Sequence, residues 1–217
     1  MPTAEHAIRW DPSQGGPQHL SQVASMLGLR EGKWKHMTVR YFSVEGPVAL
    51  PPGYRLIGRE RTGPDGTECM VKLRGPAPLP EPLLPWAIPL KGELKRKQEF
   101  DVSWGAEGPL TSALSVSGTV VAASLQEVLT DGYHATPSER MHQMVRLKDK
   151  ALDITIEAWH LHSGRHIFEV SGEGEVGADG LPMDVASDAF QLRVVRPLTA
   201  GSLKALAQGL TTLAEQT

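Results

Sequence analysis

Apolar and polar residues alternate along many short stretches of the chain, and this alternation is typical of half-buried β-strands. Gly63-Pro64-Asp65-Gly66 separates two of these stretches and is a strong turn signal. We expect a total of about eight strands from this pattern. The predicted strands cover residues 5–10, 36–44, 54–61, 68–74, 90–104, 141–147, 153–161, 165–171 and 188–196.

Helical spacing of apolar residues occurs in fewer places. Residues 17–27 predict a helix, because Pro17 suits a first turn and Gly28 suits a stop. Residues 110–114 and 120–129 also have helical spacing, and the segment after Thr199 predicts an amphipathic helix. Strands and helices do not alternate regularly, so we expect one α+β domain over residues 1–217 that is mainly antiparallel β.

The best-defined local prediction is a β-hairpin around His162-Ser163-Gly164, where glycine suits the left-handed position of a three-residue loop. Pairing Leu161 with Arg165 sets its register. This register places acidic residues directly opposite each other, which destabilises a sheet. The acidic pairs therefore need a cation, Arg or Lys partners, or open water; they are Glu157 with Glu169, and Asp153 with Glu173.

Charged residues of other predicted strands also gather on one face. Basic residues share a face in strands 54–61 and 68–74, and strand 90–104 carries a mixed face. A solvated outer face is the ordinary explanation for any one strand. If the sheet closes and these faces point inward, they would bind an anion and a divalent cation, as a metal–polyphosphate requires. The residues are Arg55, Arg59 and Arg61; Lys72 and Arg74; and Lys95, Lys97, Glu99 and Asp101.

The composition mainly excludes certain partners and types of site. The net charge of -3 gives no global attraction to nucleic acid or an anionic membrane. No apolar run approaches the ~20 residues that cross a bilayer, and the first residues lack an export signal. The single cysteine, Cys69, excludes an intrachain disulfide and a multi-cysteine metal site. We expect a cytoplasmic protein without membrane or nucleic-acid partners.

Three histidines surround the hairpin turn. His160 and His166 face each other across the hairpin end, and His162 lies in the turn. Imidazoles at this spacing are either a Zn²⁺ or Ni²⁺ cluster or a half-buried, neutral pair at the rim of a barrel. A third ligand on the same face is not apparent from the sequence.

Several motifs, and the order of the elements, resemble the triphosphate tunnel metalloenzymes, or CYTH proteins, a closed eight-stranded β-barrel family. The similar segments are Glu5-His6-Ala7-Ile8-Arg9, Tyr41-Phe42-Ser43-Val44-Glu45, Arg59-Glu60-Arg61, Val71-Lys72-Leu73-Arg74-Gly75 and Lys97-Gln98-Glu99-Phe100-Asp101. The resemblance implies a β-barrel tunnel with a few flanking helices. It also implies metal-assisted hydrolysis of a triphosphate. Independently of the resemblance, six prolines within residues 75–89 predict an extended, proline-rich loop.

The resemblance assigns two sets of residues. Phosphate-binding residues would be Arg9, Arg59, Arg61, Lys72, Lys97 and Arg146. Ligands of Mg²⁺ or Mn²⁺ would be Glu99, Asp101, Glu157, Glu169 and Glu173. Three positions depart from the family pattern: Ala7 replaces a metal-ligating glutamate, Arg9 replaces a lysine, and Ser171 interrupts a late acidic motif.

Two functions remain open from the sequence. In the first, the protein binds a phosphorylated or polyphosphate small molecule in a charged tunnel, with hydrolysis low or lost because Ala7 removes one metal ligand. In the second, it is a non-catalytic β-rich scaffold that binds a protein partner through an exposed strand edge or the proline-rich loop. The sequence assigns no catalytic residue in either case.

Overall fold

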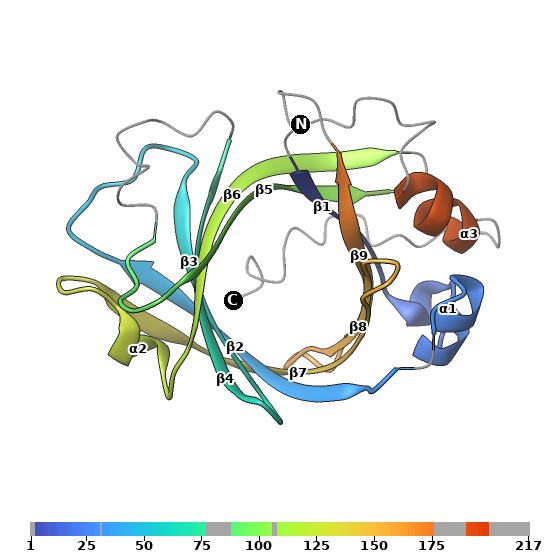
Figure 1. The fold of residues 1–217 in the computed structure, drawn as a ribbon, viewed down its shortest axis with the longest axis horizontal. Helices are drawn as coiled ribbons and strands as arrows, with labels where there is room; N and C mark the ends of the chain where they lie inside the picture. Colours follow the sequence, from blue (N-terminus) through green and yellow to red (C-terminus); the bar gives the residue numbers. More distant parts are fainter. Residues whose placement is uncertain (1–2, 31, 77–87, 106–107, 176–189, 200–217) are drawn as a thin grey trace. The chain divides into compact units, whose positions relative to one another are not determined.

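The computed structural model describes residues 3–30, 32–76, 88–105, 108–175 and 190–199 (Figure 1). Nine strands occur in this part of the chain, with few and short helices. The strands are β1 (Thr3–Trp10), β2 (Lys35–Glu45), β3 (Arg55–Gly63), β4 (Gly66–Gly75), β5 (Lys95–Trp104), β6 (Pro109–Val121), β7 (His134–Asp149), β8 (Ile154–His160) and β9 (His166–Glu175). The helical segments are η1 (Pro12–Gln14), α1 (Leu20–Met26), α2 (Leu125–Val128), η3 (Gln191–Val195) and α3 (Arg196–Thr199).

The strands follow the hydrogen-bonded order β1-β5-β6-β4-β3-β2-β7-β8-β9, which closes as a barrel. The prediction of a β-rich barrel with a few helices is therefore confirmed. Two details of it were off, because the described residues hold nine strands and the sheet is mixed. β1 pairs with β5 in parallel and with β9 in antiparallel orientation.

The chain divides into two compact units. Of the described residues, unit 1 comprises 3–30, 32–36, 100–105, 108–112, 143–175 and 190–199, and unit 2 comprises 37–76, 88–99 and 113–142. Strands β2, β5, β6 and β7 each contribute residues to both units. Among the described residues, no helix is long and apolar enough to span a bilayer.

The core of unit 1 lies beneath one face of β1. Ile8 and Trp10 are fully buried there, and the Trp10 indole donates a hydrogen bond to the Pro17 carbonyl at 3.0 Å. His6 is also fully buried and its Nδ1 accepts a hydrogen bond from the Trp104 indole at 2.7 Å. The ring of Phe190 stacks on His6, with 5.6 Å between ring centroids, so residues after β9 complete this core.

The core of unit 2 forms where β3, β4 and α2 pack together. Cys69, Val71 and Leu125 are fully buried in it. The Leu125 backbone N–H donates to the Glu60 carboxylate at 2.7 Å, which ties the start of α2 to β3. Gly58 makes this packing possible, because a Cβ there would lie 2.5 Å from Leu125.

One helical prediction was wrong and another was too long. Residues 109–121 form β6, of which residues 114–121 pair with β4, and within the region 120–129 the helix is limited to Leu125–Val128. Pairing with β4 overrides the local helical spacing. In this register Leu114 and Val116 lie on one face of β6, and Ser115 and Ser117 lie on the other.

The predicted last strand was also wrong. Residues 191–195 form a single π-type segment that continues into α3. The buried residues Phe190, Val194 and Leu198 recur every four positions, which is a helical period, whereas Leu192 is 42% exposed. Residues 77–87 of the proline-rich loop and the predicted helix after Thr199 lie outside the described residues.

The other strong local signals are confirmed. Gly63 pairs with Gly66 across a two-residue turn, with Gly66 at a φ of 109°. The predicted helix at residues 17–27 forms over Leu20–Met26, and Gly28, with a φ of 62°, follows its end.

Candidate functional site

The predicted acidic hairpin forms from β8 and β9. The Leu161 N–H donates to the Arg165 carbonyl at 2.9 Å, which confirms the register inferred from the turn. Glu157 therefore lies directly opposite Glu169, and the two residues are 5% and 8% exposed. Two carboxylates at such positions need partners, because buried charges are stable only when they are paired.

Arginines provide those partners. Arg9 Nε lies 2.6 Å from a carboxylate oxygen of Glu169, and Arg146 Nε lies 3.3 Å from one of Glu157. The Trp159 indole N–H also donates to Glu157 at 3.0 Å. Of the three partners that the sequence allowed, Arg side chains are the ones that the structure supplies. These two carboxylates are occupied and are therefore poor metal ligands.

The pKa values of Glu169 and Arg9 are both raised, for different reasons. Burial raises the pKa of Glu169, and although Arg9 opposes this shift, the negative charges of Glu157 and Glu5 add to it. Burial alone would lower the pKa of Arg9, but its pairing with Glu169 outweighs burial and raises it. The site therefore holds a permanently charged arginine beside a carboxyl that takes up a proton more readily than usual.

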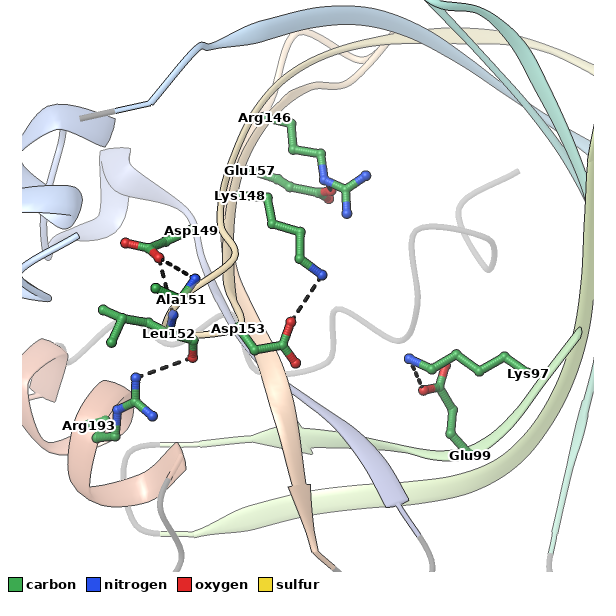
Figure 2. A network of polar contacts seen from close by, with 10 residues as sticks. All are labelled: Lys97, Glu99, Arg146, Lys148, Asp149, Ala151, Leu152, Asp153, Glu157 and Arg193. Carbon is green, nitrogen blue, oxygen red and sulfur yellow. Dashed lines mark hydrogen bonds and ion pairs between the residues drawn. The ribbon is translucent and has the colours of Figure 1, made fainter. Parts of the chain in front are cut away.

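Asp153 does not pair with Glu173 as predicted. β8 begins at Ile154, opposite Gly172, and Asp153 lies in the preceding turn with a φ of 49°. Its carboxylate instead forms an ion pair with Lys148 at 3.0 Å (Figure 2). The turn shortens the strand by one residue, which removes the second acidic pair.

Strand register arranges the polar face of unit 1 in three rows. The first row reads positive, negative, negative, positive; the second is small and mostly neutral; the third is acidic. Ala7 stands in the second row, between a charge-balanced row and an acidic one. The rows are Arg146, Glu157, Glu169 and Arg9; Lys148, Thr155, Ser171, Ala7 and Ser103; and Glu173, Glu5 and Asp101.

Two residues of the acidic row join Glu99 in a group of potential cation ligands. Carboxylate oxygens of Glu5, Glu99 and Asp101 lie within 4.8 Å of one another. Glu5 is the register partner of Asp101 on β5 and of Glu173 on β9. Oxygen ligands of this kind suit Mg²⁺ or Mn²⁺. Glu99 is also ion-paired with Lys97 of its own strand (Figure 2), so Lys97 sits beside a carboxylate.

Basic residues of unit 2 share one face of β3 and β4. Arg55 lies opposite Arg74, and Lys72 lies opposite Ile57, one row away. Arg59 and Arg61 follow on the same face of β3. We refer to these five residues as the basic face; all are half-buried, and Arg59 pairs with Glu68 at 3.1 Å. Hydroxyl residues flank it in the same rows, namely Ser43 on β2 and Ser117 and Thr119 on β6.

The predicted site residues separate into three local sets. Arg59, Arg61 and Lys72 belong to the basic face. Arg9 and Arg146, for which phosphate binding stays a prediction, form ion pairs with Glu169 and Glu157. Asp101 and Glu173 stand in the acidic row, and Glu99 of β5 pairs with Lys97. Glu5 was missed as a cation ligand, although it is the first residue of the opening motif and lies on the same side of β1 as Ala7 and Arg9.

A scan against known protein families finds no match, and no curated protein matches either. Two solved structures resemble the fold weakly. The PH1012 protein from Pyrococcus horikoshii OT3 has 8% sequence identity and a TM-score of 0.36, over 77% of each chain. The PH1819 protein of the same organism has 10% identity and a TM-score of 0.36, over 80% of this chain and 78% of that one. Similarity at this level carries no argument about family or activity.

Proposed function

We propose that this protein binds a phosphorylated or polyphosphate small molecule through the basic face of β3 and β4. The observation that carries the proposal is the β3–β4 register, which puts Arg55, Arg59, Arg61, Lys72 and Arg74 on one face. Guanidinium groups match phosphate oxygens in charge and in hydrogen-bond geometry. The neighbouring hydroxyls of Ser43 and Ser117 add neutral donors to the same rows.

The partial burial of the basic face strengthens this proposal. The five basic residues of this face are all half-buried. Solvent screens half-buried charges less than exposed ones, so a bound anion interacts with them more strongly. The Arg59 side chain is 17% exposed, which fits this role.

In unit 1, the acidic row would hold a divalent cation. Glu5 and Asp101, with Glu99, offer oxygen ligands suited to Mg²⁺ or Mn²⁺. A divalent ion, when bound, would lower the pKa of its bound water and so supply a nucleophile for hydrolysis. Hydrolysis is expected to be weak, because Ala7 contributes no ligand and because Glu157 and Glu169 are engaged by arginines.

The test combines calorimetry and thermal shift with tripolyphosphate and ATP. We expect tripolyphosphate to raise the Tm of the wild-type protein, since a ligand that binds only the folded state stabilises it. The double variant Arg59→Ala, Lys72→Ala should remain folded and lose this effect. The matched control is Arg96→Ala with Lys150→Ala, which removes the same charge from two exposed positions.

Two results would contradict the proposal. In the first, the control loses as much binding as the double variant, which would make the effect one of net charge alone. In the second, the wild-type protein binds no phosphate compound, which would favour the alternative of a scaffold with a protein partner.

A further inference from the structure

Two histidines adjoin each other at the turn end of the β8–β9 hairpin. His160 and His166 are register partners, and their ring centroids lie 4.2 Å apart with the rings inclined at 60°. Strand alternation places them on the face opposite Glu157 and Glu169. Both side chains are exposed, so an ion in solution reaches them without any opening of the core.

The backbone around the pair is well fixed. Leu161 N–H donates to the Arg165 carbonyl, and Gly164 N–H donates to the Leu161 carbonyl, both at 2.9 Å. Arg165 also lies 3.6 Å from the Asp11 carboxylate, which links the turn to the segment after β1. The two histidine Cα atoms are therefore held at a fixed separation, and only side-chain torsions need to adjust when a ligand binds.

We propose that His160 and His166 together bind a divalent transition-metal ion that prefers imidazole nitrogen, with Cu²⁺ bound more tightly than Ni²⁺ or Zn²⁺. Imidazole suits these ions, and a site with no imposed geometry follows their general order of affinity. The described residues provide no third His, Cys, Asp or Glu that joins the pair in one cluster, so water completes the coordination. This site is separate from the proposed phosphate site and does not depend on it.

The environment of His160 supports metal binding. Partial burial lowers the pKa of His160, and the charge of His166 lowers it further. A neutral imidazole is the form that ligates a metal, so His160 needs to release little or no proton at neutral pH.

The test measures Cu²⁺ binding to the full chain by calorimetry and by electron paramagnetic resonance. We expect His160→Asn and His166→Asn each to weaken binding at least about tenfold. The spectrum should show hyperfine coupling to two imidazole nitrogens in the wild-type protein and to one in either variant. All the substituted positions are exposed, so circular dichroism should confirm an unchanged fold.

His162→Asn and His134→Asn are the controls, since each removes one exposed imidazole from outside the pair. Both should retain wild-type affinity and a two-nitrogen spectrum. The proposal is overturned if His160→Asn and His166→Asn bind Cu²⁺ as tightly as the wild-type protein. It is equally overturned if His162→Asn weakens binding as much as they do.

Discussion

Glu157 and Glu169 lie directly opposite each other on β8 and β9, both buried, with an arginine beyond each of them. Removing one partner of a buried ion pair costs more than the pair itself contributes, because it leaves an uncompensated charge. The order Arg146, Glu157, Glu169, Arg9 thus balances charge along one row of the sheet, and each member depends on its neighbours.

We expect Glu157→Gln to lower the pKa of Glu169. The substitution removes a negative charge that raises this pKa, while Arg9 remains in place. Carbon-13 NMR titration of the glutamate carboxyl groups measures the effect, with the exposed Glu127→Gln as control. A Glu169 pKa that stays at its wild-type value would contradict the electrostatic account.

The raised pKa of Glu169 also makes the stability of the protein depend on pH. The Glu169 pKa is raised in the folded state, so its contribution to stability is complete below the pKa of the unfolded chain. This contribution is lost as pH rises through the folded-state pKa. Glu157→Gln should therefore reduce the loss of stability on going from acidic to neutral pH. Denaturant unfolding at a series of pH values checks this sign.

We expect Ala7→Glu to make the free energy of unfolding depend on a bound metal ion. Ala7 is 5% exposed between Ser171 and Ser103, with Glu5 and Arg9 on the same side of β1, so a glutamate there adds a buried negative charge. The variant should be less stable than the wild-type protein without metal. Mn²⁺ or Mg²⁺ at 100 times its Kd should then restore about 2.7 kcal/mol.

Ala7→Gln is the matched control, because it adds the same volume without the charge. Release of phosphate from tripolyphosphate should also rise in Ala7→Glu when Mn²⁺ or Mg²⁺ is present. Equal melting curves for the two variants with and without metal would show that position 7 does not contribute to a cation site.

Gly58→Ala should destabilise the protein by about 1–3 kcal/mol through overpacking. A Cβ at Gly58 would lie 2.5 Å from Leu125 and 2.9 Å from Val44, inside the core of unit 2. Gly108→Ala is the control, since a Cβ there has no neighbour within 4 Å. Urea unfolding of both variants measures the difference, and equal midpoints would contradict the packing.

Cys69 should be unreactive in the folded protein. The thiol is fully buried, and burial, with the charges of Glu60, Glu127 and Glu68, raises its pKa to about 11. A colorimetric disulfide reagent at pH 8 should modify it only slowly, and rapidly once guanidinium unfolds the chain. Fast modification of the folded protein would contradict this environment.

Local chemistry made part of this structure predictable. The hairpin followed from Gly164, whose φ is 83°, and from strand alternation, and Gly63 to Gly66 closed the second hairpin for the same reason. The segments at 109–121 and 191–195 were not predictable, because their apolar spacing fits both a helix and a strand. Long-range partners decided between these alternatives, namely β4 in the first case and the core around His6 in the second.

The candidate site was likewise predictable only where local patterns determine it. Alternation alone placed Arg59 and Arg61 on one face, and the turn register placed Glu157 opposite Glu169. The pairing of Arg9 with Glu169 joins residues 160 positions apart in the chain. No local pattern encodes such a contact, so the sequence did not predict this ion pair.

The position of β1 has a consequence for how the chain reaches its native state. β1 is hydrogen-bonded on one side to residues 100–104 and on the other to residues 168–175. During synthesis, the backbone groups of residues 3–10 therefore gain both sets of hydrogen-bond partners only after β9 has left the ribosome. Such long-range pairings slow folding. Until β9 has been synthesised, one edge of β1 stays unpaired, and chaperones bind unpaired edges of this kind.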